Sequence, residues 1–161
     1  MDTPITVIPN GSVTSPRGYR AGATAATIKT RPGALDLALL VSDRETTVAG
    51  MFTRNLIVGA PVVVSRERIA NGRLRAVVGN SGCANALNGT GGYDDAVEMT
   101  VLAARHLGIE AEDVAVASTG VTGVRLPMQK LRDGLPRVEV RSRSTRSRRR
   151  STAAPTSPSR S

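Results

Sequence analysis

Three short runs of apolar residues, each bounded by glycine, proline or polar residues, limit the fold of this sequence more than any other feature. The runs are Leu35–Val41, Leu74–Gly79 and Val114–Ala117. Their length and their content of valine, leucine and alanine are typical of buried β-strands. Leu35–Val41 is apolar almost throughout, so we expect a strand that is covered on both faces. The sequence therefore predicts a sheet of short strands.

Weaker patterns extend this sheet toward the N-terminus. Four further segments are predicted as strands: Ile5–Ile8, Tyr19–Ile28, Thr46–Phe52 and Ala60–Val64. Tyr19–Ile28 is assigned to a strand because Gly22 and the repeated threonines weaken a helix, whereas β pairing tolerates threonine. Lys29–Gly33 predicts a loop, and Arg66–Asn71 predicts a single helical turn that ends at Gly72.

One helix is clear from the pattern. Asp94 and Asp95 suit the positive end of a helix dipole and predict its first turn. The residues that share one face at helical spacing are Val97, Val101, Ala104 and Leu107. Gly108 favours a left-handed helix end. A second, shorter helix is predicted for Pro127–Asp133, with Gly134 at its end.

The segment Asn80–Gly92, between a predicted strand and the first of these helices, is rich in turn-forming and hydrogen-bonding residues. It lacks the G-K-[S/T] sequence of a phosphate-binding loop, which argues against a nucleotide site. Loops at the junction of a buried strand and a helix often hold ligands. We therefore expect this loop at the edge of a substrate pocket.

Side chains with strong nucleophilic or metal-binding chemistry are scarce. Cys83 is the only cysteine, so it forms no internal disulfide and no metal site by itself, and we interpret it as a small packing residue. His106 is the only histidine and lies in the last turn of the predicted helix, a position that suits the negative helix end better than a catalytic base. No Ser/His/Asp triad and no metal site are predicted.

Aromatic residues are nearly absent, since the chain has one phenylalanine, two tyrosines and no tryptophan. The core is therefore expected to consist of valine, leucine, isoleucine and alanine. No apolar run approaches the length of a membrane span, and the N-terminus lacks the basic and apolar regions of a secretory signal. These observations favour a cytoplasmic location without a membrane partner.

The composition changes after Pro136. Residues 137–161 contain eight arginines and one acid, and only Val138 and Val140 are large and apolar. Because such a segment buries too little surface to offset its chain entropy, we expect a folded part over residues 1–136 and a disordered tail over 137–161. The tail could bind RNA or acidic surfaces electrostatically, but it lacks aromatic residues for base stacking, which makes nucleic acid an unfavoured partner. A lost reading frame or a truncation is the favoured interpretation of this composition.

Val114–Gly123 joins a predicted strand to a polar tip. Val114–Ala117 runs into Ser118-Thr119-Gly120, which predicts a sharp turn that presents hydroxyl groups and backbone N–H groups, and a second turn follows at Thr122-Gly123. Fixed donors at such a tip suit the stabilisation of a developing oxyanion, because they need no reorganisation during the reaction. Taken alone, this spacing is more often that of an ordinary turn.

Several segments in the same order give the sequence a specific resemblance. Val114–Lys130 resembles the STGVIG…LPMDK segment of the ornithine acetyltransferases, which are also called glutamate N-acetyltransferases. Further blocks agree in register: Ser15–Arg20, Asp36–Asp43, Ala49–Asn55, Ala60–Ser65 and Val78–Ala86. The similarity covers about residues 12–135, and several ordered blocks are far more specific than any single one.

This resemblance implies an α/β fold of layered sheets and helices, similar to the N-terminal nucleophile hydrolases, of which this chain would form an incomplete α-chain fragment. It implies transfer of an acetyl group from N-acetylornithine to glutamate in arginine biosynthesis, through an acetyl-threonine intermediate. Some members of the family also accept acetyl-CoA as the acetyl donor. No other cofactor is implied.

By the same resemblance Thr119 and Gly120 form an oxyanion hole, Thr119 through its hydroxyl and Gly120 through its backbone N–H. The family's nucleophile is a threonine exposed by self-cleavage, and it has no counterpart in this chain. We therefore expect a separate β-chain to complete the site in a hetero-oligomer, and we expect this chain alone to be inactive. The alternative is a folded, non-enzymatic remnant with a basic tail.

Overall fold

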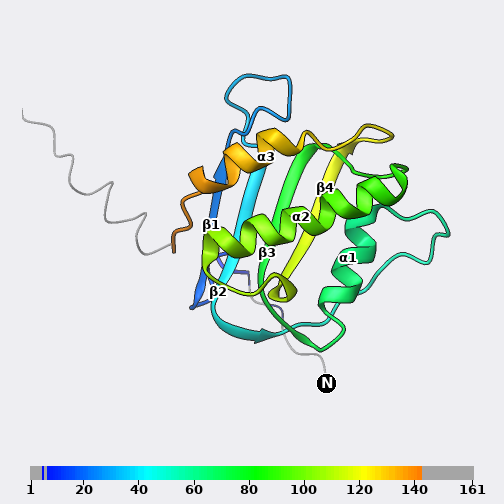
Figure 1. Cartoon of the computed structure of the whole chain (residues 1–161). Coiled ribbons are helices and arrows are strands. Elements are labelled where there is room, and N and C mark those ends of the chain that lie inside the picture. Colours follow the sequence, from blue (N-terminus) through cyan, green and yellow to red (C-terminus); the bar gives the residue numbers. More distant parts are fainter. Residues whose placement is uncertain (1–4, 6, 143–161) are drawn as a thin grey trace, which may run out of the picture.

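The sheet and its helices form two layers (Figure 1) in a computed structural model that describes residue 5 and residues 7–142. The strands are β1 (Tyr19–Thr24), β2 (Leu37–Thr47), β3 (Arg73–Cys83) and β4 (Val114–Val121), and they lie in the sheet in that order. β1, β2 and β3 are antiparallel neighbours, whereas β4 runs parallel to β3. A parallel pair needs a crossover connection, which a helix between β3 and β4 supplies.

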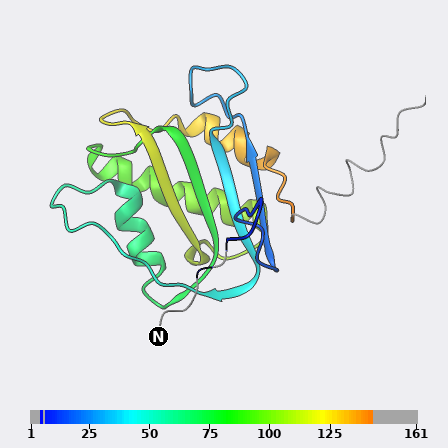
Figure 2. The ribbon, with the colours of Figure 1, turned by 180° about the vertical axis from the view of Figure 1, so that it is seen from behind.

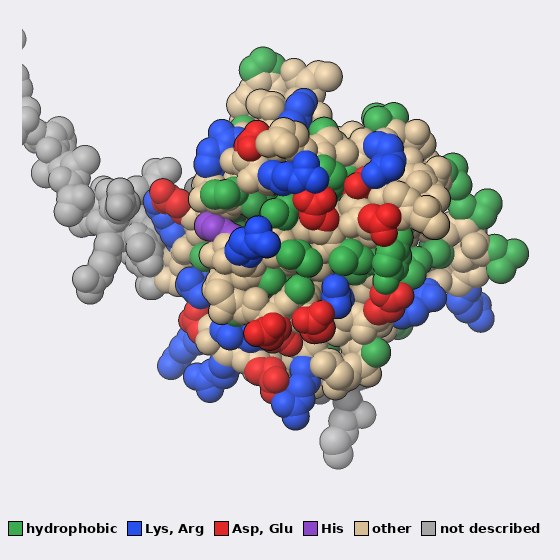
Figure 3. All heavy atoms as spheres, in the orientation of Figure 1, with side chains coloured by type: hydrophobic (Ala, Val, Ile, Leu, Met, Phe, Trp, Pro, Cys, Tyr) green, Lys and Arg blue, Asp and Glu red, His purple; other side chains and the backbone are tan. Residues whose placement is uncertain are grey.

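The helices gather on one face of the sheet. They are α1 (Ala60–Arg68), α2 (Gly89–Leu107) and α3 (Met128–Gly134), with short 3₁₀ helices η1 (Ala111–Asp113) and η2 (Leu135–Arg137). Seen from behind, the strands lie in front of α2 and α3, so neither of these helices covers that face (Figure 2). On the helix side, acidic and basic side chains lie next to one another (Figure 3), and Arg132 of α3 pairs with Glu98 of α2 at 2.6 Å.

α1 closes the free edge of β4. The Ser65 hydroxyl donates to the Val116 carbonyl at 2.6 Å and accepts a hydrogen bond from the Val116 N–H at 2.9 Å. These are backbone groups that a further strand would otherwise pair. One side chain therefore satisfies an edge residue of the sheet.

The core lies between the sheet and the helices. Alternate residues of the strands are buried there: Leu37, Leu39, Val41, Ala76, Val78, Val114 and Val116. Met99 and Ala103 of α2 and Leu131 of α3 are fully buried against them. No aromatic side chain belongs to this core within the described residues, as the composition predicts.

The opposite face of the sheet is open. Ala38 is exposed, and Leu40 and Val77 are half-buried, although their neighbours along the strands are buried. A broad concavity of about 1140 Å³ extends over these residues. The expectation that Leu35–Val41 is covered on both faces is therefore wrong for the described part of the chain, because no described helix or strand packs on this side of β2 (Figure 2).

Several predicted strands are wrong. Ala60–Val64 forms the first turns of α1, where Pro61 at the helix start is well tolerated. Of Thr46–Phe52, only Thr46 and Thr47 belong to a strand, and the described residues of Ile5–Ile8 lie outside the sheet and are exposed. Short apolar runs do not distinguish a strand from a buried helical segment, which explains the error at Ala60–Val64.

α2 begins more than a turn earlier than predicted, so Asp94 and Asp95 do not form its first turn. Its buried face consists of Gly92, Asp95, Ala96, Met99, Thr100, Ala103 and Ala104. Of the predicted face, only Ala104 is fully buried. The small residues pack closest to the sheet, and the valines lie at the margin. The left-handed end at Gly108 is confirmed, with φ of 67°.

The folded part continues beyond Pro136. Val138 is buried in the core, and Arg141 pairs with Ala21 through two backbone hydrogen bonds of 3.0 and 3.1 Å along the free edge of β1. The expected boundary at residue 136 is therefore wrong for residues 137–142, because Val138 supplies the apolar anchor that the average composition of the segment hides. Residues 143–161 of the expected tail lie outside the described residues.

Candidate active site

Thr119 and Gly120 lie inside β4, not in a turn after it. Ser118, Thr119 and Gly120 stand in register with Asn80, Ser81 and Gly82 of β3. The predicted sharp turn is thus wrong, because β3 also runs on as far as Cys83 and offers the polar residues a partner strand. The second predicted turn is confirmed as a bend that begins at Thr122.

The two strand ends approach each other unusually closely at a pair of glycines. Gly82 and Gly120 have φ of 115° and 133°, and the ladder is irregular between Gly82 and Cys83. A β-carbon on Gly120 would lie 2.6 Å from the Cys83 nitrogen and 2.7 Å from the Gly82 carbonyl oxygen. No larger residue fits at Gly120 without moving the backbone, which accounts for the glycine in the Thr-Gly pair.

Thr119 is exposed beside this glycine pair. Its hydroxyl makes no hydrogen bond to any residue that the structure describes, so the group is available to a ligand at the end of β4. A hydroxyl on a strand that is held on one side by β3 is a fixed donor, the property that an oxyanion hole requires.

Asn80 holds the irregular end of β3. Its side-chain amide donates to the Cys83 carbonyl at 3.0 Å, and the residue is 5% exposed. Its Oδ1 and the Oγ of Ser118, the residue opposite in β4, are buried without a partner among the described residues. The sequence indicates Asn80 only as part of a polar loop, and its position on a strand was missed.

The segment after β4 is tied to the loop before α2. Val124 accepts two hydrogen bonds at its carbonyl, one from the Cys83 thiol at 3.0 Å and one from the Asn88 side chain at 2.9 Å. Asn88 also donates to Asn85, which is fully buried with φ of 49°. Cys83 is buried and forms no disulfide, in keeping with a packing role. Of the predicted Asn80–Gly92 loop, only the part between Cys83 and Gly89 is loop.

An ion pair reinforces the same connection. Arg125 donates to both carboxylate oxygens of Asp95 on α2, at 2.7 and 2.8 Å. The hydrogen bond to Asp95, followed by its charge, raises the pKa of Arg125. Asp95 is buried while Arg125 is largely exposed, so the arginine covers a carboxylate that burial would otherwise penalise. Asp95 was predicted in the first turn of the helix, and its role as the partner of Arg125 was missed.

The loop that connects β1 to β2 packs against Gly82 of the glycine pair. Ile28 lies against Gly82, where an added β-carbon would be 2.9 Å from its Cγ2. The buried Asp36 carboxylate fixes this loop, since it accepts hydrogen bonds from the backbone N–H groups of Ala26 at 2.6 Å and Lys29 at 2.9 Å. The candidate site is therefore built on restrained backbone from three segments.

His106 takes no part in this arrangement. It is exposed near the end of α2, and its Nε2 lies 2.9 Å from the carbonyl oxygen of Val138. Within residue 5 and residues 7–142, no group of three or more His, Cys, Asp or Glu side chains is placed to hold a metal ion. In the same residues, no helix is long and apolar enough to cross a membrane.

Comparison with known proteins identifies the family. A family model described as the ArgJ family matches residues 20–157, which is most of the chain. The chain belongs to the ArgJ family. This match includes the segment with Thr119 and Gly120 and extends past Pro136.

Curated ArgJ relatives are similar over the same region. The arginine biosynthesis bifunctional protein ArgJ of Dehalococcoides mccartyi is 44% identical over 136 residues, which cover 84% of this chain and 34% of the relative. The protein of the same description from Geobacter sulfurreducens is 48% identical over 120 residues, 74% of this chain and 30% of the relative. The chain thus spans about a third of the length of these ArgJ relatives.

Solved ArgJ structures share the fold. A structure of the ArgJ protein of Bacillus halodurans has a TM-score of 0.79 and 36% identity, and the match covers 83% of this chain and 69% of that one. The ornithine acetyltransferase of Mycobacterium tuberculosis, solved in complex with ornithine, has a TM-score of 0.77 and 44% identity over 80% of this chain and 70% of that one. The predicted α/β class and its likeness to N-terminal nucleophile hydrolases are confirmed.

Proposed function

We propose that the chain supplies the oxyanion hole of an acetyltransferase that moves the acetyl group of N-acetylornithine to glutamate. The observation that carries the proposal is the exposed Thr119 hydroxyl next to Gly120, at a pair of closely packed strand ends in an ArgJ-family chain. The description of the Mycobacterium tuberculosis neighbour as an ornithine acetyltransferase complexed with ornithine supports the substrate class. In this proposal the nucleophile lies outside the described residues, on a β-chain.

The proposed reaction has two acyl-transfer steps. A threonine hydroxyl attacks the acetamide carbonyl of N-acetylornithine, the carbon–nitrogen bond breaks, and ornithine leaves after its amine takes a proton. The amine of glutamate then attacks the acetyl-threonine ester, N-acetylglutamate forms, and the threonine hydroxyl regains its proton. Each attack places negative charge on the carbonyl oxygen in a tetrahedral intermediate.

Thr119 and Gly120 would stabilise that charge. The Thr119 hydroxyl and the Gly120 backbone N–H would donate to the oxyanion, and the packing of Gly120 on Gly82 keeps the donors in place. Acetyl-CoA as a second donor, the hetero-oligomer with a β-chain and a cytoplasmic location are parts of the same proposal. They rest on the family membership.

The test is Thr119→Ala in a chimera in which this chain is joined to the remaining C-terminal part of the Geobacter sulfurreducens relative. Loss of one oxyanion donor is expected to lower kcat about a hundredfold with little change in KM, because the donor acts mainly in the transition state. Turnover is measured as N-acetylglutamate formed from N-acetylornithine and glutamate.

Thr122→Ala is the matched control, since Thr122 is an exposed threonine two residues beyond Gly120. It is expected to leave kcat unchanged. If Thr119→Ala lowers only the melting temperature and leaves turnover intact, Thr119 shapes the strand and the oxyanion assignment is withdrawn.

A further inference from the structure

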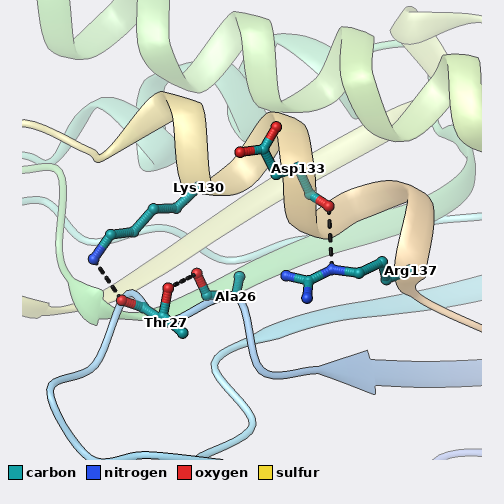
Figure 4. A pocket seen from close by; sticks show the side chains of 5 residues that line it. All are labelled: Ala26, Thr27, Lys130, Asp133 and Arg137. Atoms are coloured by element: carbon teal, nitrogen blue, oxygen red, sulfur yellow. Dashed lines mark hydrogen bonds between the residues drawn. The ribbon is translucent and has the colours of Figure 1, made fainter.

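A hollow with two basic side chains in its lining lies between the loop after β1 and the segment formed by α3 and η2. It has a volume of about 410 Å³ and is lined by Ala26, Thr27, Lys130, Asp133 and Arg137 (Figure 4). One wall is the loop after β1, and the other is α3 with η2. Cavities of this size accommodate small metabolites.

Two cations face the hollow without a carboxylate partner. Lys130 Nζ donates to the Thr27 carbonyl at 2.6 Å, and Arg137 donates to the carbonyls of Asp133 at 3.2 Å and Ala25 at 3.3 Å. Neither cation forms a salt bridge with an acid in the part of the chain that the structure describes. An ammonium has three N–H donors and a guanidinium has five, so both groups retain donors for a ligand.

The acid in the hollow is engaged elsewhere. The Asp133 carboxylate accepts a hydrogen bond from the Gln129 side chain at 3.0 Å. In Figure 4 it extends away from Ala26 and Thr27, and only the Asp133 backbone carbonyl lies on the side of Arg137. The charges that line the hollow are thus two positive and one negative, and both positive side chains reach from α3 and η2 to the loop after β1.

The loop wall is preformed. The Asp36 carboxylate, which is 3% exposed, binds the backbone N–H groups of Ala26 and Lys29, and Thr27 between them has φ of 61°. A ligand would therefore meet a fixed surface, and binding would cost little ordering of the chain.

We propose that this hollow binds a small oxyanion, namely the carboxylate or phosphate group of a metabolite, through Lys130 and Arg137. Charge-assisted hydrogen bonds from two cations favour such a group over chloride. The inference does not depend on the acetyl-transfer function. It adds one consequence: because Ile28 of the same loop packs on Gly82, an anion in the hollow changes the surroundings of the β3 end.

The test is an NMR titration of the ¹⁵N-labelled full chain with sodium phosphate and, separately, with sodium acetate, both at constant ionic strength held with sodium chloride. Saturable shifts are expected for the amides of Thr27, Lys130 and Asp133, with a dissociation constant on the order of 1–10 mM. A smaller shift is expected at Gly82. Saturation by phosphate alone identifies a phosphate site, and saturation by both anions or by acetate alone identifies a carboxylate-binding site.

Three variants assign the donors. Lys130→Gln is expected to weaken binding about tenfold, and Lys130→Gln combined with Arg137→Gln to abolish the saturable shifts. Arg137→Lys, which keeps the charge, provides the test of Arg137 if the double variant does not fold, and it is expected to retain most of the affinity. Arg132→Gln is the control, because Arg132 lies on the same helix but pairs with Glu98, and it is expected to bind as the unchanged chain does. Linear shifts with both anions, or an affinity that is undiminished in folded Lys130→Gln, overturn the proposal.

Discussion

The two faces of the sheet differ in how well their apolar residues are covered. On the helix side Leu39, Val78 and Val116 are at most 3% exposed and contact α2 or α3 or their neighbours in the core. On the other side Leu40 and Val77 are half-buried, and Ala117 is exposed. The helix side also carries the larger apolar side chains, whereas Ala38, Gly79 and Ala117 on the open side are small, so the covered face is the one that carries most of the apolar burial of the described part.

The difference also separates two kinds of residue at the candidate site. Asn80 and Ser118 belong to the helix side with Val78 and Val116, two positions earlier on each strand, and they are held in the interior. Thr119 is on the alternate position and is exposed. The proposed oxyanion donor, Thr119, therefore lies on the open side of the sheet. The buried polar residues beside it, Asn80 and Ser118, lie on the covered side.

The largest expected effect contrasts neighbouring leucines of β2. Leu39→Ala is expected to lower the free energy of unfolding by about 3 kcal/mol, because it removes a fully packed side chain and leaves a cavity. Leu40→Ala is expected to cost about 1 kcal/mol or less, since that side chain is half in solvent already. Urea unfolding of the two variants measures both. Equal losses would mean that the open face is covered in solution.

A smaller effect contrasts two glycines. Gly134 lies at the end of α3, where a β-carbon would be 2.8 Å from Ala26 Cβ and 2.9 Å from Leu37 Cδ2, so Gly134→Ala is expected to cost about 1–3 kcal/mol. Gly79 is on the open face, where the only contact of an added β-carbon is the Ala117 carbonyl oxygen at 3.7 Å. Gly79→Ala is expected to change stability by less than about 0.5 kcal/mol in the same unfolding experiment. A severe loss at Gly79 would contradict the open-face description.

The smallest effect concerns the outer surface of the helix layer, where Tyr93 of α2 donates to the Glu67 carboxylate of α1 at 2.7 Å. This hydrogen bond, with some desolvation and the charge of Glu67, raises the pKa of Tyr93. A raised pKa means that the folded state holds the proton more tightly. The stabilisation is therefore full below the unfolded tyrosine pKa of about 10 and is lost as the pH rises through the folded value.

Melting temperatures of the unchanged chain and of Tyr93→Phe check this expectation. The small advantage of the unchanged chain at pH 8 is expected to vanish at high pH. Glu67→Gln is the control, because it keeps an acceptor but removes the charge. An advantage that persists unchanged above the tyrosine pKa would show that the contact between α1 and α2 does not depend on this proton.

The sequence was sufficient for the elements with strong local signals. The strands predicted at Leu35–Val41, Leu74–Gly79 and Val114–Ala117 are confirmed over most of their length. The helix with its left-handed end at Gly108 is confirmed too, because a short apolar run and a left-handed cap are local signals. The error at Ala60–Val64 has a physical cause: its valines satisfy a strand as well as a helix, and only packing beside β4 decides. Val138 was missed because one buried residue outweighs the average composition of its segment.

The candidate site was predicted only in part. Ser118-Thr119-Gly120 resembles a turn when read alone, and its strand conformation depends on a partner, β3, that is distant in sequence. Asn80, Asp95 and Asp36 support the site through contacts with residues 3, 30 and 7 to 10 positions away. No periodicity in the chain encodes such contacts, so the sequence gives no sign of which polar residues become interior supports.

The hydroxyl of Ser65 has a consequence for how the protein behaves in concentrated solution. A sheet with unpaired backbone at its edge is a template on which a second molecule can add its own strand. At Val116 that template is occupied by a side chain of the same molecule, which accepts and donates as a neighbouring strand would. At the opposite edge, the backbone of Arg141 pairs with the backbone of Ala21 through two hydrogen bonds. Self-association by strand addition is thereby blocked at these two positions, one on each side of the sheet.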